Sequence, residues 1–300
     1  MLSARNGARE IVGLLDIGSS KICCAIAERT HGLGEAGVSG LRLLAVTQQR
    51  SDGVRNGMVV DLDRAEVNTR QAVALTEQKA GVTLSQIIVA VSSGRLSSQH
   101  FSAQVDLEDG EVRPSDLDRI ARRAQEYAVR DGGKLLHMNR IHYSLDGEIG
   151  VRRPLGMAGH RLTCQYHAVT GDPASLRNIE GLIERCYLSV AGFVPSGLAS
   201  ALAATTADEQ QFGVACLDIG AGATKVAVIA DGRFLHVDTI AVGGAYLTHD
   251  VAVMLSTPLA EAERIKTLCG TIMCARSDEN VSIPYWRSDE SGFVAYQSQQ

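Results

Sequence analysis

Short apolar runs and longer stretches of helical spacing alternate along the chain. Runs of strand length occupy residues 11–17, 21–27, 41–47, 85–93, 99–107, 140–145, 161–169 and 233–241, and residues 214–229 have the pattern of strand, turn and strand. Apolar runs of this length, bounded by turn-forming residues, predict buried β-strands.

Apolar residues recur at helical spacing in five other segments. These are residues 61–81, 113–133, 172–190, 243–255 and 257–270. In the third segment Asp172 can cap the helix and Pro173 suits its first position. No helical stripe follows residue 277, so residues 278–300 are predicted to be irregular.

The segment from residue 83 to residue 168 differs from its surroundings. It holds one well-marked amphipathic helix, 113–133, with strand candidates on both sides. This pattern predicts a small α+β unit inserted into a larger domain.

Composition narrows the class of protein without defining its chemistry. A length of 300 residues suits about two domains. The net charge of −5 gives no electrostatic argument for nucleic-acid binding. No apolar run has the length of a signal peptide or of a membrane-spanning helix. The seven cysteines form no C-x-x-C pair, so they are interpreted as thiols in a reducing, cytoplasmic compartment.

One short motif occurs twice. Residues 14–26 read LLDIGSSKICCAI and residues 216–229 read CLDIGAGATKVAVI. In each copy an apolar strand ends at an aspartate, a glycine follows two residues later, and a second strand begins after small residues. For one copy alone an ordinary turn is the simpler interpretation, because Asp and Gly are turn formers. Two copies favour two related half-domains that face each other.

The repeated motif has the chemistry of a phosphate site. Glycine lets the backbone approach a ligand closely, and successive N–H groups in a tight turn can bind phosphate oxygens. A carboxylate repels phosphate, so each aspartate would instead hold a hydrated Mg²⁺ ion that bridges the two. Lys21 and Lys225 follow the turns, and Lys21 is the better phosphate ligand because its turn is shorter. Neither copy matches a P-loop or a dinucleotide fingerprint.

Paired D-x-G turns resemble the phosphate loops of the actin, heat-shock chaperone and sugar-kinase superfamily. Three further stretches are similar to parts of that superfamily: 194–204 to its connecting helix, 242–250 to its Gly-Gly turn, and 260–266 to its adenosine-facing helix. With the insert at 83–168, residues 10–277 resemble FtsA-type cell-division proteins. The segments GVRNGMVVDLD, VAVSSGRLSSQHFSA, GEVRPSDLDRIARRA and RIHYSLDG carry that likeness.

The resemblance implies an α/β, actin-like (ribonuclease H-like) two-domain fold with an inserted α+β subdomain and an incomplete second domain. The expected subdomains are 10–82 with 169–192, the insert 83–168, 193–241, a nucleotide-facing helical part 242–277, and the tail 278–300. ATP and Mg²⁺ are the implied cofactors. The implied phosphate ligands are Gly18, Ser19, Ser20, Lys21, Gly220, Gly222, Ala223, Thr224, Gly243 and Gly244. Asp16 and Asp218 would hold the metal through water, and Glu263 and Lys266 would face the adenosine. A solvated ion pair is the alternative for the last two.

FtsA-type proteins link the tubulin-like protein FtsZ to the membrane and assemble into filaments. The resemblance therefore implies FtsZ and other division proteins as partners, the latter through the insert, and a place at the inner face of the membrane at the septum. Family members usually continue beyond this length into an amphipathic helix that binds the membrane, so membrane contact is expected only through such a helix. Phe193, Val194 and Pro195 offer no general base where relatives carry an acid, so at most weak ATPase activity is expected.

Three alternatives come from the same superfamily. A small-molecule kinase would need a catalytic aspartate, for which the sequence offers no convincing candidate. A chaperone-type ATPase would lack the insert and would carry an acid near residue 194. A pilus-assembly scaffold would share the insert, and binding to FtsZ would distinguish it from a division protein.

Overall fold

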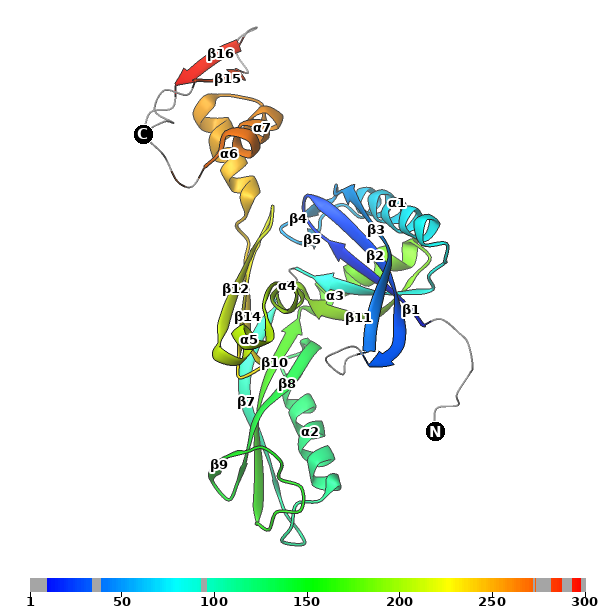
Figure 1. Cartoon of the computed structure of the whole chain (residues 1–300), viewed down its shortest axis with the longest axis vertical. Coiled ribbons are helices and arrows are strands. Elements are labelled where there is room, and N and C mark those ends of the chain that lie inside the picture. The colour runs from blue at the N-terminus through cyan, green and yellow to red at the C-terminus, as the bar shows by residue number, and fades with distance from the viewer. Residues whose placement is uncertain are drawn as a thin grey trace. The chain divides into compact units, whose positions relative to one another are not determined.

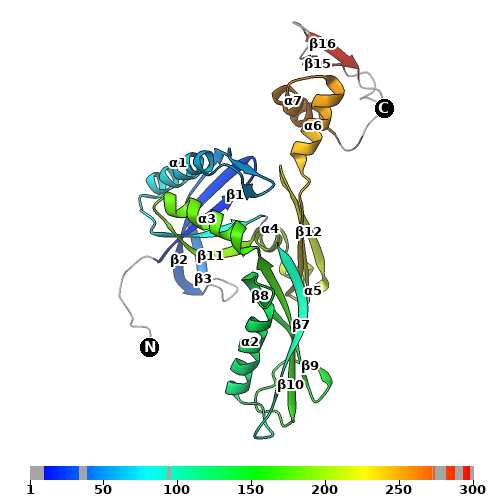
Figure 2. The same ribbon diagram turned by 180° about the vertical axis from the view of Figure 1, so that it is seen from behind.

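The computed structural model describes residues 10–33, 39–92, 96–271, 273, 282–287 and 293–297. The chain divides into two compact units, residues 1–241 and 242–300. The described part of the first unit contains three larger sheets and a two-stranded one, and that of the second contains two helices and a hairpin. Figure 1 labels these elements, and Figure 2 shows them from behind.

The first sheet has the strand order β11-β6-β1-β2-β3. Its strands are β1 (Glu10–Ile17), β2 (Lys21–Leu33), β3 (Ser39–Arg50), β6 (Gln86–Val91) and β11 (Ser189–Pro195). The first three strands pair antiparallel, whereas β6 runs parallel to both β1 and β11. The carboxyl ends of β1 and β6 therefore meet at one edge of the sheet.

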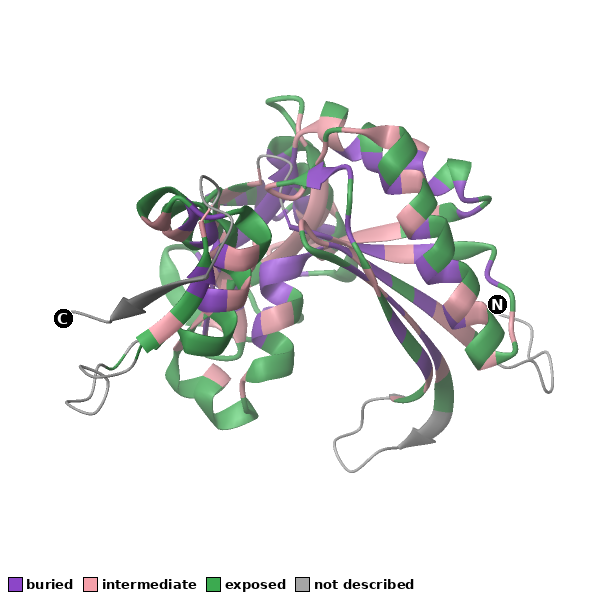
Figure 3. Cartoon of the chain, turned by 90° about the horizontal axis from the view of Figure 1, so that it is seen from above, coloured by how far each residue is buried: buried purple, intermediate pink, exposed green. Residues whose placement is uncertain are grey.

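Helices α1 (Leu62–Ala80) and α3 (Pro173–Arg185) pack on this sheet and against each other. Asp61 and Asp172 cap them, and Pro173 occupies the first turn of α3, as the sequence predicts. Buried Leu and Ile side chains of the sheet and of α3 pack with small residues of α1 in one core. Figure 3 shows the resulting stripes of buried and exposed positions along the strands.

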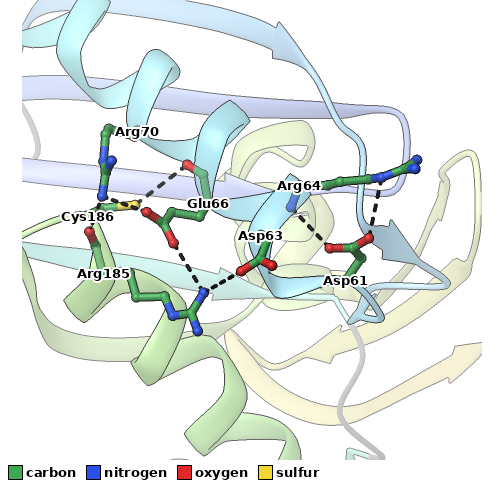
Figure 4. Close-up of polar contacts among 7 residues, drawn as sticks. All are labelled: Asp61, Asp63, Arg64, Glu66, Arg70, Arg185 and Cys186. Atoms are coloured by element: carbon green, nitrogen blue, oxygen red, sulfur yellow. Dashed lines mark hydrogen bonds and ion pairs between the residues drawn. The ribbon is translucent and has the colours of Figure 1, made fainter.

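A polar contact network also joins α1 to α3. The Arg185 guanidinium donates to Asp63 at 2.9 Å and to Glu66 at 3.2 Å. Arg70 donates to Glu66 and to the Arg185 carbonyl, both at 2.6 Å. Figure 4 shows Asp63, Glu66 and Arg70 of α1 facing Arg185 of α3. They supplement the apolar core rather than replace it, because exposed ion pairs contribute little to stability.

The insert forms a second sheet of order β7-β10-β8-β9 covered by α2. Its elements are β7 (Ser97–Asp106), α2 (Pro114–Ala128), β8 (Lys134–Leu145), β9 (Glu148–Val151) and β10 (Arg161–Gly171). Ile120, Ala124 and Ala128 of α2 are buried against the sheet. The inserted α+β unit is thus present, as the sequence predicts.

The third sheet has the order β12-β13-β14, with all pairs antiparallel. It consists of β12 (Val214–Ile219), β13 (Thr224–Ala230) and β14 (Arg233–Ile240), and helices α4 (Ser196–Ala204) and α5 (Ala207–Phe212) precede it. Leu198 and Ala201 of α4 pack with Ile229 and Phe234 of the sheet, and Val169 of β10 joins this core. The third sheet therefore shares its core with the insert.

The second unit contains α6 (Gly244–Leu255), α7 (Leu259–Cys269) and the antiparallel strands β15 (Ser282–Trp286) and β16 (Phe293–Gln297). The two helices pack together, and α7 contacts β15. Arg264 of α7 donates to the Pro284 carbonyl at 2.7 Å.

Three boundaries differ from the sequence predictions. Residues 86–91 lie inside the first sheet, so the insert begins after Val91 and not at 83. The helix predicted over 172–190 ends at Arg185, and Ser189–Pro195 is a strand of the first sheet. The predicted irregular tail contains the β15–β16 hairpin; residues 278–281, 288–292 and 298–300 lie outside the described part. The tail was predicted to be irregular because it lacks helical periodicity, but short paired strands do not have that periodicity either.

Candidate functional site

The two copies of the repeated motif lie together at one cavity of about 250 Å³ in the first unit. We call residues 16–21 turn 1, residues 218–225 turn 2, and the space between them the two-turn cavity. Its lining includes Asp16, Gly18, Ser19, Ser20, Lys21, Asp218, Gly220, Gly222 and Ala223, all predicted from the sequence. Ala221, Lys225, Gly57 and Ser92 complete the lining, whereas Thr224 is not part of it.

The sheets deliver both turns in the same way. β1 ends at Ile17 and β2 begins at Lys21, and the Gly18 N–H donates to the Lys21 carbonyl at 3.0 Å. In turn 2 the Gly220 N–H donates to the Ala223 carbonyl at 2.9 Å. The repeated sequence therefore makes a repeated backbone hydrogen bond, with the aspartate near the end of the first strand in each case.

Glycine at position 222 allows the two turns to approach each other. A Cβ atom there would lie 2.5 Å from Ser19 Oγ and 3.0 Å from the Asn56 nitrogen, closer than atoms can pack. At position 18 a Cβ would lie 2.8 Å from the Lys21 carbonyl oxygen of its own turn. Gly222 thus fixes the distance between the turns, and Gly18 fixes the shape of turn 1.

A small hairpin holds turn 1 from the side. It pairs β4 (Val54–Arg55) with β5 (Met58–Val59) around Asn56 and Gly57, whose φ angles are 50° and 72°. Two positive φ angles define the tight hairpin turn that Asn-Gly favours. The Gly57 N–H donates to Ser19 Oγ at 3.1 Å. This contribution was not predicted from the sequence, although Asn56-Gly57 is a signal for such a turn.

Asp218 of turn 2 is held by two hydrogen bonds. Lys225 Nζ donates to Asp218 Oδ2 at 3.0 Å, and Ser200 Oγ of α4 donates to the same oxygen at 2.8 Å. Burial alone would raise the pKa of Asp218, but these two donors outweigh it and keep the pKa below its usual value. Asp218 is therefore a carboxylate whose charge is balanced within the protein.

Asp16 of turn 1 is the opposite case. Its Oδ1 is buried and has no hydrogen-bond partner among the described residues. Burial raises its pKa, and the nearby Asp218 raises it further, although Lys225 opposes both. A buried carboxylate oxygen without a donor is costly, and a hydrated cation supplies what it lacks. The two carboxylates of the cavity therefore fit an Mg²⁺ ion bound through its waters.

The two lysines of the cavity differ in their surroundings. Lys225 is buried at 9% exposure and is bound to Asp218. Lys21 is exposed and forms no ion pair with any other residue of the described ranges. An ammonium group that is not neutralised can balance the charge of a bound anion, whereas Lys225 already balances a carboxylate.

The other four predicted ligands belong to the second unit. Gly243 caps α6, and Gly244 begins it. Lys266 Nζ of α7 donates to the Gly244 carbonyl at 3.2 Å, to Thr248 Oγ1 at 2.8 Å and to Glu263 Oε2 at 2.6 Å. The hydrogen bond from Lys266 keeps the pKa of Glu263 low, and a second one from Thr248 adds to it. The unit thus brings Gly244, Glu263 and Lys266 together, with Glu263 and Lys266 as an ion pair.

Comparisons with known proteins agree with the actin-like class of protein that the paired turns indicate. A family model described as the SHS2 domain inserted in FtsA matches residues 93–170, and one described as cell division protein FtsA matches residues 215–294. The PilM-PilN type IV pilus biogenesis complex superposes with a TM-score of 0.58 at 17% identity, over 86% of this chain and 69% of that one. The fold is therefore actin-like, with an inserted SHS2 domain, as the resemblance implied.

Curated relatives identify the family. Cell division protein FtsA of Agrobacterium fabrum is 40% identical over 280 residues, which is 91% of this chain and 63% of the relative. The Pseudomonas aeruginosa protein is 33% identical over 95% of this chain and 67% of its own length, and the Escherichia coli K12 protein is 30% identical over 92% and 65%. The chain belongs to the FtsA family of cell-division proteins.

The comparisons also adjust the extent of the resemblance. The FtsA family model reaches residue 294, beyond residue 277 where the sequence analysis ended its likeness. The chain spans about 63% of the length of the first curated relatives. No helix in the described ranges has the length and apolar character needed to cross a bilayer.

Proposed function

We propose that the two-turn cavity binds the triphosphate of ATP together with Mg²⁺. One observation carries the proposal: two turns of the same sequence, delivered by different sheets, line one cavity that contains the unpartnered Asp16 Oδ1. Turns of this kind present backbone N–H groups to phosphate oxygens from both sides. The actin-like fold supports the same ligand class, since the actin-like ATPase superfamily typically binds nucleotide.

Each residue then has a defined role. The backbone of Ser19 and Ser20 would bind phosphate from one side, and that of Gly222 and Ala223 from the other. Gly18 and Gly220 would shape the turns, because their N–H groups donate within them. Thr224 does not line the cavity, and its phosphate role rests on the resemblance alone. Lys21 balances phosphate charge, and Asp16 and Asp218 accept hydrogen bonds from the waters of the metal. Mg²⁺ neutralises and orients phosphate oxygens. The roles of Gly243, Gly244, Glu263 and Lys266, which belong to the second unit, stay predictions from the resemblance.

The cellular role follows from the family. We propose that the protein links FtsZ to the membrane at the division septum, assembles with copies of itself and recruits other division proteins through the SHS2 insert. The support is the family assignment. Co-sedimentation with FtsZ polymers tests this role: retention of the chain in the FtsZ pellet is expected, and its absence would favour a scaffold of another assembly.

Turnover of ATP is proposed to be slow. Phe193, Val194 and Pro195 end β11 just before α4, and none has a side chain that can activate water. ATP then stabilises one arrangement of the protein instead of driving rapid chemistry. Release of phosphate at ordinary kinase rates of about 1–100 per second would contradict this.

Calorimetric titration with ATP tests the site directly. Wild type is compared with Asp16→Asn, and Asp118→Asn, an exposed position on α2, serves as the matched control. We expect Mg²⁺ to strengthen ATP binding to wild type and to the control, and to have little effect on Asp16→Asn. Equal Mg²⁺ dependence in all three proteins would contradict the proposed metal position, and no ATP binding to wild type would contradict the site itself.

A further inference from the structure

A second cavity of the first unit lies away from the two turns. Its volume is about 490 Å³, and it lies where β8 and β9 of the insert meet α5 and the turn between β13 and β14. That volume falls within the roughly 300–1,000 Å³ that ligand pockets usually have. None of its lining residues lines the two-turn cavity, so the nucleotide proposal does not account for it.

Three arginines converge on this space, which we call the arginine cavity. Arg140 comes from β8, Arg152 follows β9, and Arg233 begins β14. None of them forms an ion pair with another residue in the described ranges, and Asp231 is the single carboxylate of the lining. Guanidinium groups remain charged at any physiological pH, so the cavity carries an excess of positive charge.

Both walls of the arginine cavity are fixed by contacts within the protein. Arg140 donates to the Tyr143 hydroxyl at 2.9 Å, and its guanidinium lies 4.8 Å from the centre of that ring. On the other wall the Asp231 N–H donates to the Gln211 carbonyl at 3.2 Å, and the Gly232 N–H donates to the Gln210 carbonyl at 3.0 Å. The charged groups are therefore presented by ordered backbone, which reduces the cost of binding.

The cavity also lies at an open strand edge. β9 pairs with β8 only over residues 143–145 of β8, although β8 begins at Lys134. Arg140, Ile141 and His142 line the cavity just where that pairing stops. Strand edges without a partner present rows of backbone donors and acceptors to an extended peptide.

Exposed apolar side chains flank the same place. Ile149, next to the lining residue Gly150, is 76% exposed, and Phe212, next to Gln211, is 88% exposed. A small phosphorylated molecule would not contact these apolar side chains. A peptide with alternating acidic and apolar side chains would contact the arginines and the apolar side chains. The positive charge, the unpaired strand edge and the exposed apolar side chains thus all favour an extended acidic peptide as the ligand.

We propose that the arginine cavity binds an extended acidic segment of a partner protein. The segment would lie along the open edge of β8 and place carboxylates against Arg140, Arg152 and Arg233. Carboxylates suit paired guanidinium donors, and such contacts are shorter and stronger than neutral hydrogen bonds. Asp231 would oppose the segment by like-charge repulsion and so limit the affinity for acidic partners.

Fluorescence anisotropy with a labelled ten-residue peptide of alternating Glu and Val tests the proposal. A peptide with Gln in place of Glu is its control. We expect the Glu peptide to bind, the Gln peptide to bind at least tenfold more weakly, and Arg152→Gln with Arg233→Gln to reduce binding at least tenfold. Arg122→Gln, an exposed arginine on α2, makes the same charge change elsewhere and should leave binding unchanged.

Asp231→Asn provides a test in the opposite direction. Asn tolerates the positive φ of 52° at this position, so the turn should keep its shape. We expect severalfold tighter binding of the Glu peptide, a gain that misfolding cannot produce. Equal binding by the arginine variant, no gain in Asp231→Asn, or binding of inorganic tripolyphosphate in preference to the peptide would each overturn the proposal. ATP titration of the same variants should match wild type, which separates this site from the two-turn cavity.

Discussion

Turn 1 and turn 2 share a sequence and a backbone hydrogen bond but differ in electrostatics. Asp218 is bound to Lys225 and Ser200, whereas Asp16 has a buried oxygen without a partner. The pKa of Asp218 is accordingly low, and burial raises that of Asp16. The carboxylate of turn 2 is therefore satisfied within the protein, whereas the carboxylate of turn 1 is not, as expected if turn 1 is where the proposed ligand binds.

The supports of the two turns differ as well. Turn 1 projects from a five-stranded sheet with its own core of β1, β2, β6, α1 and α3 residues. Turn 2 projects from a three-stranded sheet that shares its core with the insert and contacts it through histidines. The His100 Nε2–H donates to the Leu235 carbonyl at 2.6 Å. Ser98 Oγ lies 2.8 Å from His167 Nε2 and 3.2 Å from His236 Nδ1.

The largest expected effect is on the free energy of unfolding, which should change in opposite directions when Asp218 and Asp16 are each replaced by Asn. Asp218→Asn removes the carboxylate bound to the buried Lys225 ammonium and leaves only the nearby Asp16 charge, which is not hydrogen-bonded to it, to balance that ammonium. This should lower the free energy of unfolding by about 3 kcal/mol. Asp16→Asn removes an unsatisfied buried charge and should raise it. Urea unfolding without nucleotide measures both. Changes of the same sign in the two variants would contradict the electrostatic difference between the turns.

As pH falls, the third sheet, which carries turn 2, should lose stability before the first sheet, which carries turn 1. His167 is fully buried, and burial, together with His100, His137 and His236, lowers its pKa to about 4. Its unfolded-state pKa is higher, so its contribution to stability is complete above about pH 6.5 and is lost as pH falls toward 4. We expect a loss of about 2 kcal/mol across that window, and a smaller one in His167→Gln.

Hydrogen exchange at pH 7 and pH 5 gives the location of this loss. Protection should fall first in residues 214–240 and later in residues 10–27. A simultaneous loss in both segments, or an identical pH profile in His167→Gln, would show that the histidine contact does not support the third sheet.

A substitution at the contact between the turns should reduce ATP binding. In Gly222→Ala the added Cβ meets Ser19 and Asn56, so the turns must separate. We expect at least a tenfold weaker affinity for ATP, or about 1.4 kcal/mol. Gly181→Ala on α3 is the control, because a Cβ there meets nothing within 4 Å. Equal affinity in both variants would show that the spacing of the turns does not matter.

The smallest effect is expected at an exposed ion pair, in contrast to the largely buried pair of Lys225 and Asp218. Arg185 bridges Asp63 and Glu66 at the surface, where solvent screens the charges. Arg185→Gln should leave the midpoint of urea unfolding almost unchanged. A shift comparable with that of Asp218→Asn would mean that α1 and α3 depend on their polar edge as much as on their core.

The sequence predicted those parts of the site that depend on local pattern. Asp16, Gly18, Gly220 and Gly222 were found because the motif is written twice. The roles of Gly57 and Ser92 depend on which segments meet in space, and a single sequence does not contain that information directly. Lys225 faces Asp218 across the β12–β13 ladder, whereas the second donor to Asp218, Ser200, comes from α4 and depends on how α4 packs against the sheet.

The errors in the predicted fold have physical causes. Residues 189–195 contain glycine and proline and follow a strong helix, so no alternation marked them as a strand; parallel pairing with β6 makes them one. In β15, Pro284 cannot donate to a ladder, which weakens the strand signal, but an edge strand tolerates it. Local signals predicted α1 along its whole length and predicted the capped start of α3 at Asp172, but not its end at Arg185.

Hydrogen exchange with and without ATP and Mg²⁺ tests most directly whether the two turns bind one phosphate chain. Peptides covering residues 14–26 and 216–229 report the turns separately. We predict that both gain protection with the same midpoint in ATP concentration, and that Asp16→Asn shifts both midpoints together. Protection of one turn alone, or of the two turns at different ATP concentrations, would contradict a shared site.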